Sequence, residues 1–195
     1  TLGNPGEVTV KFSSPYLKSA EVKINCHRYS KTEDIILSDP FIFADEDSQT
    51  YYMTGTGGML WKSKDLKVWD GPVRVAQTDP QSWMGPNPNI WAAEIHKHQG
   101  KYYFFGTFTN PRMIIQEYRG NKIERRACHI LVSDNPEGPY VPMEEETYLP
   151  ADQPTLDATR WYEDGQPYMI FCHEWLQVGD GEMCAMPLKE DLSGP

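Results

Sequence analysis

The chain has 195 residues, of which 39% are apolar and 12% aromatic, enough to bury the core of one or two domains. Its formal net charge of −10 argues against a partner with a phosphate backbone, which requires clustered Lys and Arg. The one dense basic stretch, 122–126, includes a glutamate and is interpreted as a solvated strand or loop. No apolar run approaches the roughly 18 residues of a membrane helix, and no signal peptide opens the chain. We therefore expect neither a nucleic-acid partner nor a membrane span.

Three segments share one layout: a strand, a short polar turn, a strand that begins with Tyr or Pro-Tyr, and a further strand followed by a polar turn. In chain order they cover 38–56 with 58–69, 91–108 with 128–140, and 155–175 with 183–195. Apolar residues two apart, such as Phe41 and Phe43 or Tyr51 and Met53, favour strands over helices. An internal repeat of strand-rich units is therefore the main feature of the chain.

The second strands of these units begin at Tyr51, Tyr102 and Pro167, so the repeat interval is first 51 and then 65 residues. Units of this size without helical periodicity are typical of propeller blades with four antiparallel strands. The predicted fold is therefore an all-β propeller. The predicted divisions are a lead-in over 1–37 and blades over about 38–90, 91–150 and 151–195. Since a propeller needs at least about four blades to close, we expect this domain to continue beyond the chain end.

Aligned on their second strands, the units place Asp39, Ala92 and Asp157 at equivalent positions. Each opens the innermost strand of its blade, and these strands run parallel to one another around the axis. Their starts should therefore meet at one mouth of the channel. Two carboxylates that are 118 residues apart in the sequence are predicted to face one cleft. Such a pair suits glycoside hydrolysis, in which one carboxylate must be ionised to activate water and another must carry a proton.

Aromatic rings beside this mouth could stack on sugar rings, although packing in the core is the alternative for each of them. The candidates are Trp83, Trp91, Trp161 and Trp175. By contrast, Trp61 and Trp69 are interpreted as packing between blades.

Four stretches of the sequence, LSDPFIF, NIWAAEIHKHQGKYYFFGTF, SDNPEGPY and TLDATRWYEDGQPYMIF, resemble blades one to three of glycoside hydrolase family 43. The resemblance covers residues 38–195 and implies a five-bladed β-propeller of which this chain holds about the first three blades. The family includes β-xylosidases, α-arabinofuranosidases, arabinanases and some galactan-acting enzymes. The resemblance further implies catalysis with inversion, with Asp39 as the general base and Asp157 as the residue that orients the general acid and raises its pKa. We expect an enzyme that degrades plant polysaccharides such as arabinan or xylan.

The general acid of the family is a glutamate that usually opens the fourth blade, which would lie beyond residue 195. Within this chain Glu174 is the best candidate for the acid or for a direct substrate contact, because the end of a second strand returns beside the start of the first. Its neighbours His173 and Trp175 are candidates for substrate binding, as are Trp91 and Glu94. The glutamate of SDNPEGPY, Glu137, is interpreted as lying on an outer turn away from the site.

No cofactor is expected to be required. The family often holds a calcium ion in the central channel, which parts of the propeller outside this chain could supply. The histidines at 96, 98, 129 and 173 lack metal-ligand spacing, and the four cysteines lack C-x-x-C spacing, so no metal site is predicted here. Cys172 and Cys184, on strands expected to be neighbours, could pair, but buried free thiols are preferred for them. The other two cysteines are Cys26 and Cys128.

The rival function from another class is a carbohydrate-binding propeller that has lost its chemistry. Fructan-acting propellers usually carry an R-D-P segment and an E-C pair, and protein-interaction propellers carry W-D or kelch signatures. Neither set occurs here. The expected location is secreted or periplasmic in a bacterium, and the oligomeric state is left open.

Overall fold

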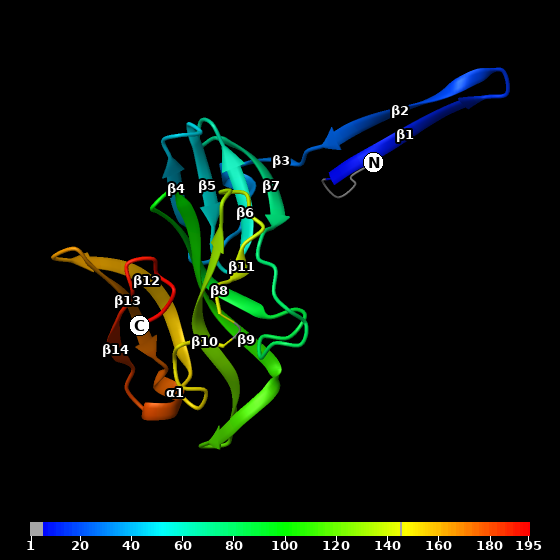
Figure 1. Ribbon diagram of the computed structural model, residues 1–195. Helices are drawn as coiled ribbons and strands as arrows, with labels where there is room; N and C mark the ends of the chain where they lie inside the picture. Colours follow the sequence, from blue (N-terminus) through cyan, green and yellow to red (C-terminus); the bar gives the residue numbers. More distant parts are fainter. Residues whose placement is uncertain (1–5, 145) are drawn as a thin grey trace.

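The computed structural model describes residues 6–144 and 146–195, which form a set of antiparallel sheets (Figure 1). The first sheet has the strand order β3-β7-β6-β5-β4, the middle sheet β11-β10-β9-β8, and the third sheet β12-β13-β14. The first sheet consists of β3 (Tyr29–Lys31), β4 (Phe41–Asp45), β5 (Thr50–Thr54), β6 (Met59–Ser63) and β7 (Val68–Arg74). The other two consist of β8 (Asn89–His98), β9 (Lys101–Tyr118), β10 (Asn121–Ser133), β11 (Val141–Pro142), β12 (Thr155–Glu163), β13 (Gln166–His173) and β14 (Glu182–Pro187).

Two-residue turns connect several of these strands. Residues 99–100, 119–120 and 164–165 each pair a polar residue with glycine, and both residues of each pair have positive φ. This is the backbone of a type I′ turn, whose twist matches that of the flanking strands. The predicted second strands each begin one residue earlier than expected, at Thr50, Lys101 and Gln166.

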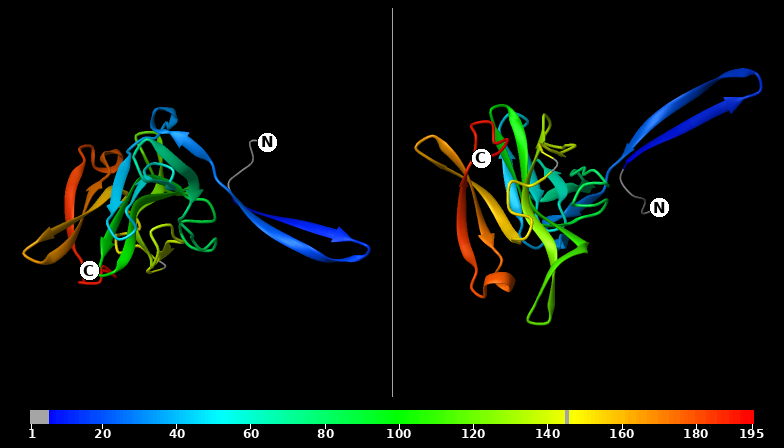
Figure 2. Two further views of the ribbon diagram at one scale, coloured as in Figure 1. Left: turned by 90° about the horizontal axis from the view of Figure 1, so that it is seen from above. Right: turned by 60° about the horizontal axis from the view of Figure 1, so that its bottom comes forward.

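The innermost strands of the three sheets lie next to one another. β4 contacts β8, and β12 contacts β8, β9 and β10, so the middle sheet is enclosed between the other two. Figure 2 shows this stacking from two further sides. The all-β prediction is confirmed. The only helices among the described residues are η1 (Thr32–Asp34) and α1 (Trp175–Val178), and neither has the length or the apolar character of a membrane-crossing segment.

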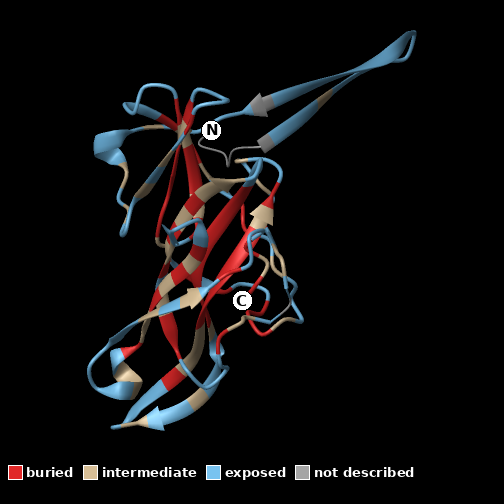
Figure 3. Cartoon of the chain, turned by 60° about the vertical axis from the view of Figure 1, so that its left-hand side comes forward, coloured by how far each residue is buried: buried red, intermediate tan, exposed pale blue. Residues whose placement is uncertain are grey.

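The run Y-Y-F-F in β9 is buried on both of its faces, and its period of two explains how. Tyr102 and Phe104 pack into the cluster toward the first sheet, which includes Leu60. Tyr103 and Phe105 pack into the cluster toward the third sheet. Successive strand residues point to opposite faces, so an unbroken apolar run is what a sheet covered on both sides requires. Figure 3 shows that the buried residues run along the strands of the packed sheets, whereas the projecting N-terminal hairpin is largely exposed.

Trp61 and Trp69 are buried in a smaller cluster with Met53. The described members of this cluster come from the first sheet and the segment before β4, so the predicted packing between blades is not seen. The cysteines are all free thiols, but only Cys128 is buried. Cys172 and Cys184 are free, as preferred, but they are only partly buried. Cys172 pairs in register with Met183 rather than with Cys184, although β13 and β14 are neighbours as predicted.

The N-terminal segment forms a separate two-stranded hairpin, β1 (Gly6–Ser14) and β2 (Leu17–Cys26), which projects away from the sheets (Figures 1 and 2). After it, β3 pairs with β7 and becomes the outer edge of the first sheet. Part of the expected lead-in thus adds a fifth strand to that sheet.

Candidate active site

Asp39 lies two residues before the first residue of β4 and has a φ of 53°. Asp tolerates this left-handed backbone better than most residues. The close approach of the next strand depends on Gly55, because a Cβ there would stand 2.7 Å from the Asp39 carbonyl oxygen. The Thr56 hydroxyl donates a hydrogen bond of 2.7 Å to Oδ2 of Asp39, whose side chain remains exposed to solvent.

The two positions aligned with Asp39 have the same unusual backbone: φ is 41° at Ala92 and 57° at Asp157. Both lie in bulges, since the pairing register shifts between Trp91 and Glu94 in one sheet and between Leu156 and Thr159 in the other. Bulges re-aim side chains at the rims of sheets. The equivalence of the three positions, inferred from the sequence repeat, therefore has a structural counterpart.

A threonine hydroxyl links each bulge to the preceding sheet. The Ala92 N–H donates to Oγ1 of Thr56 (3.1 Å). We call this contact region between the first and middle sheets the first join. The Asp157 N–H donates to Oγ1 of Thr107 (2.9 Å). We call this contact region between the middle and third sheets the second join. The sequence analysis missed both threonines. A signal was present, because Y-Y-M-T-G-T and Y-Y-F-F-G-T carry Gly-Thr at the same distance from the start of the strand.

The electrostatics of Asp157 connect it to Asp39. Burial raises the pKa of Asp157 above its ordinary value, and the negative charges of Asp39 and Glu94 raise this pKa further, while Arg126 lowers it. The Asp157 side chain is nevertheless open to solvent at one side. Two carboxylates from different sheets are thus close enough to influence each other, which is the arrangement predicted for one shared mouth.

Glu174 follows the last residue of β13, and its backbone N–H donates to the carbonyl of Pro154, just before β12. This contact brings it to the same end of the third sheet as Asp157. Glu174 is only 4% exposed, and its side chain forms an ion pair with Arg126 of β10. Burial raises the pKa of Glu174, Arg126 acts against this rise, and the charges of Glu124 and Asp157 add to it.

Arg126 is a third site residue that the sequence analysis missed. The stretch 122–126 was interpreted as solvated, but it belongs to β10, where Ile123 is buried and Arg126 is half-buried. Its Nε donates to Oγ1 of Thr109 (2.9 Å), and its guanidinium lies over the ring of Trp91 at 5.8 Å from the ring centre. Three polar or aromatic partners at the join of two sheets explain why this cation is not solvated.

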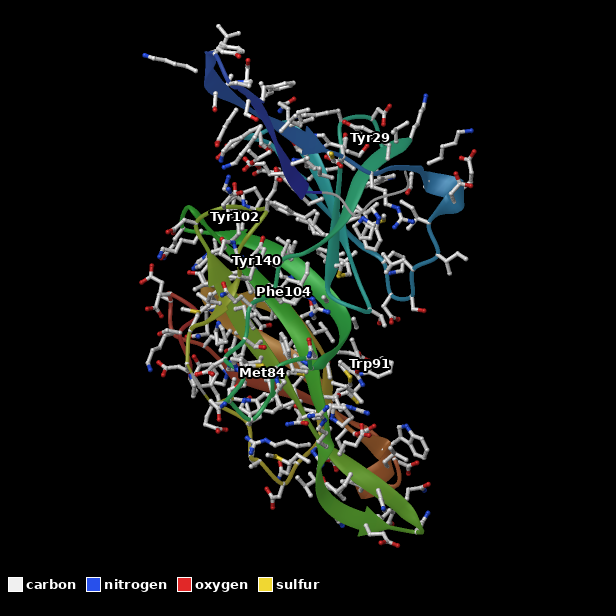
Figure 4. The ribbon with its side chains drawn as sticks, turned by 90° about the vertical axis from the view of Figure 1, so that its right-hand side faces the viewer. Tyr29, Met84, Trp91, Tyr102, Phe104 and Tyr140 are labelled. Atoms are coloured by element: carbon white, nitrogen blue, oxygen red, sulfur yellow. The ribbon has the colours of Figure 1, made fainter. Side chains whose placement is uncertain are left out.

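The tryptophans divide between the mouth and the rest of the fold. Trp91, beside Ala92, is 41% exposed, and Figure 4 shows it apart from the core residues Phe104 and Met84. Trp175, beside Glu174, is 60% exposed. Trp83 is buried in the cluster between the first and middle sheets. The prediction that its ring lies beside the mouth was therefore wrong, and the alternative of core packing holds for it.

Trp161 is exposed, but it lies four residues beyond Asp157 along β12 and pairs with Tyr168 near the far turn of the hairpin. The strand rises about 3.3 Å per residue, so Trp161 is displaced from the mouth. Its interpretation as a mouth aromatic was also wrong.

Glu94 and His173 are tied to neighbours rather than free. Glu94 accepts a hydrogen bond of 2.7 Å from Thr159 of the third sheet and contacts Nε2 of His96 at 2.8 Å. The ring of His173 contacts Oε1 of Gln177 in α1 at 2.8 Å. Glu94 therefore bridges β8 to β12, one pleat beyond the Ala92 position, and His173 orients α1, which carries Trp175.

Glu137, set aside in the sequence analysis, forms an ion pair with Lys62 of the first sheet (2.7 Å). It stands beyond the far end of β10 from Arg126. Among residues 6–144 and 146–195, no group of three His, Cys, Asp or Glu side chains is arranged to hold a metal ion.

A family model for glycosyl hydrolases family 43 matches residues 32–194, which is most of the chain. The chain belongs to this family. The match includes the two aspartates, Arg126 and Glu174, and it leaves out the β1–β2 hairpin. The comparison with curated proteins gave no match.

Solved structures agree with this assignment. The endo-arabinase of Bacteroides thetaiotaomicron VPI-5482 is 32% identical, with a TM-score of 0.69 over 84% of this chain and 55% of that one. An endo-1,4-β-xylanase of the same organism is 19% identical, with a TM-score of 0.58 over 81% and 49%. The endo-1,5-α-L-arabinanase of Thermotoga petrophila RKU-1 is 19% identical, with a TM-score of 0.51 over 82% and 39%.

The present chain thus spans only about half of the length of these proteins, or less. The prediction of a partial β-propeller of family 43 is confirmed. The similar solved structures also include an exo-β-1,3-galactanase of Phanerochaete chrysosporium, 12% identical, with a TM-score of 0.57 over 82% of this chain and 36% of that one.

Proposed function

We propose that this family 43 chain carries the catalytic carboxylates of an inverting glycosidase that cleaves arabinose, xylose or galactose linkages in plant polysaccharides. The observation that carries the proposal is the convergence of Asp39 and Asp157. They come from different sheets, share a left-handed backbone, and are near enough for the charge of Asp39 to raise the pKa of Asp157. The 32% identity to an endo-arabinase supports arabinan as the first substrate to try.

In this proposal Asp39 is the general base. The Thr56 hydroxyl holds its Oδ2, and within the described residues no hydrogen bond reaches its Oδ1, which is free to take a proton from water. An inverting enzyme places that water between the base and the general acid, whose carboxyl groups stand about 6.5–9.5 Å apart. The water attacks the anomeric carbon from the face opposite to the leaving oxygen.

Glu174 is the candidate for the general acid. Its burial and its raised pKa suit a group that must carry a proton before it protonates the leaving oxygen. Asp157, whose negative charge contributes to that raised pKa, would tune and orient it. Trp91 and Trp175, exposed on either side, would offer apolar faces to sugar rings.

The first test uses the protein at its full natural length with arabinan, xylan, galactan and aryl glycosides. NMR of the anomeric product should show inversion, and Asp39→Asn should reduce kcat/KM by about 10²–10⁴-fold, the usual contribution of general base catalysis. Asp164→Asn, in the exposed turn of the β12–β13 hairpin, is the matched control. Retention of configuration, or an Asp39→Asn variant that keeps more than a tenth of the activity, would contradict the proposal.

A second test separates the roles of the two acids. A good leaving group needs no proton from the enzyme, so Glu174→Gln should be strongly impaired on natural linkages and only mildly impaired on a dinitrophenyl glycoside. Asp39→Asn should be impaired on both. If Glu174→Gln is impaired equally on both substrates, the acid lies elsewhere, as the general family pattern implies.

The alternative function, a carbohydrate-binding propeller without chemistry, draws support from one observation. Glu174 is paired with Arg126, and such a pair favours the ionised form over the protonated form that an acid needs. If the wild-type protein binds oligosaccharides and hydrolyses none of the substrates above, this function replaces the enzymatic one. Secretion or export to the periplasm of a bacterium remains our prediction, because the polymers are found outside the cell.

A further inference from the structure

Arg126 is held at the second join by partners from both sheets. It lies on β10, which packs against β12, and its side chain is 20% exposed. Nε donates to Thr109, Nη1 donates to Glu174, and the face of the guanidinium covers Trp91. A planar guanidinium makes such simultaneous contacts in one geometry, which a flexible ammonium does not.

Thr109 closes this arrangement. Its hydroxyl oxygen accepts a hydrogen bond from Nε1 of Trp91 at 3.2 Å in addition to the bond from Arg126. Thr109 is completely buried, so its position is determined by the packing of β9. One fixed hydroxyl group thus couples the orientation of the Trp91 ring to that of the Arg126 guanidinium. The guanidinium in turn orients the Glu174 carboxylate.

The charges around Glu174 are unbalanced without Arg126. Glu124 faces it from β10 and Asp157 faces it from β12, and both are negative. Arg126 is the cation that opposes them, through its ion pair with Glu174. A nearly buried carboxylate next to two others is strongly disfavoured unless a positive group compensates.

We propose that Arg126 is a positioning residue of the active site, which holds the Glu174 carboxylate and the Trp91 ring in a fixed relation across the join of the middle and third sheets. This inference rests on the proposed function, because it assigns Arg126 a role in the same reaction. The same cation lowers the pKa of both Glu174 and Asp157, against the effect of their burial. Arg126 would thereby set the pH range in which the acid is protonated.

The test compares Arg126→Gln with Arg125→Gln in the protein at its full natural length. Arg125 is the preceding residue on β10, is 14% exposed, pairs with Glu146 at 2.6 Å and covers the ring of Trp83. It therefore matches Arg126 in burial and in type of contact, but it faces away from the site. Its substitution controls for the loss of a partly buried arginine.

For Arg126→Gln we expect kcat/KM to fall about 10–100-fold, with the alkaline limb of its pH profile shifted upward by about one pH unit. Removing a neighbouring cation raises the pKa of a carboxyl by about this amount or more, so the acid stays protonated to higher pH. Arg125→Gln should leave the limb unchanged. Arg126→Lys keeps the positive charge but loses the planar guanidinium that makes several contacts at once. The alkaline limb of its pH profile should therefore stay near the wild-type position, while kcat/KM still falls.

Melting temperatures of all three variants separate this role from a purely structural one. If Arg126→Gln and Arg125→Gln lose stability alike and neither moves the alkaline limb, the positioning role is overturned. The proposed function fails in a different way, namely if Asp39→Asn retains its hydrolytic activity. A wild-type enzyme that depends on Asp39 but is indifferent to Arg126 would overturn this inference alone.

Discussion

The first and second joins use the same backbone device for different chemistry. In both, a residue with positive φ in a bulge donates its N–H to a threonine that follows a glycine on the preceding sheet. At the first join Thr56 donates onward to the Asp39 carboxylate at 2.7 Å. At the second join the position equivalent to Asp39 is Ala92, and the Thr107 hydroxyl contacts Sγ of Cys128 at 3.9 Å instead.

This difference shows which part of the site belongs to the fold and which to the function. The bulge, the threonine and the left-handed residue recur because they connect neighbouring sheets. The carboxylates at 39 and 157 are placed on that repeated support, and position 92 carries a methyl group in the same backbone. A propeller thus provides several equivalent positions at one mouth, of which this chain uses two for acids.

Removing the two threonine hydroxyls separately tests whether the two joins differ in function, and it should have the largest effect. Thr56→Val and Thr107→Val each lose the bond to a bulge N–H and should each destabilise the protein by about 1–3 kcal/mol. Only Thr56→Val also releases Asp39, so its kcat should fall about tenfold or more, since hydrogen bonds to charged groups are worth about 1.5–3 kcal/mol. Steady-state kinetics and thermal melts measure both effects. Equal losses of kcat in the two variants would show that the joins do not differ in function.

A smaller effect concerns stability and pH at the second join. Because the pKa of Asp157 is raised in the folded protein, the stability tied to this group is complete below about pH 4 and is lost as the pH rises through the folded-state pKa. Asp157→Asn should therefore melt higher than wild type at pH 7, by a few degrees at most because the side chain is partly solvated. The gain should vanish near pH 3. An Asp157→Asn variant that melts lower at pH 7 and equally at pH 3 would contradict this reasoning.

The smallest effect tests the shared backbone itself. Ala92 has a φ of 41°, and a left-handed residue with a Cβ costs about 1–2 kcal/mol. Glycine removes this strain, but its greater freedom in the unfolded chain cancels part of the gain. Ala92→Gly should therefore stabilise the protein by up to about 1 kcal/mol. The control is Ala93→Gly, which removes a fully buried methyl group and should destabilise by about 1 kcal/mol or more. Chemical denaturation of both variants measures the change in the free energy of unfolding. A change of the same sign in both variants would refute the explanation.

Much of the fold could be predicted because its signals are local. The hairpin turns, the alternation of Phe41 and Phe43, and the spacing of Tyr51 and Tyr102 depend on period-two strands and on turn residues. The equivalence of the two aspartates followed from the repeat alone, since repeated units place equivalent residues at equivalent points around an axis.

The errors at the site concern side chains whose surroundings the local sequence does not specify. Trp83 and Trp161 have the same composition signal as Trp91, but one packs inside a core and the other lies toward the opposite end of its strand. Arg126 looked like a solvated basic residue because its partners, Thr109 and Glu174, are distant in the sequence or belong to a different sheet.

The strands, their repeat and the equivalent positions of the two aspartates could be predicted from the sequence, since these features depend on contacts within one unit. Only the folded structure shows that Arg126 covers Trp91 and pairs with Glu174. It likewise shows that the Thr56 hydroxyl binds the Asp39 carboxylate, whereas the Thr107 hydroxyl contacts the Asp157 backbone and Cys128. These contacts arise where two sheets meet, and the balance of burial and charge that governs the pKa of a carboxyl exists only after they have met.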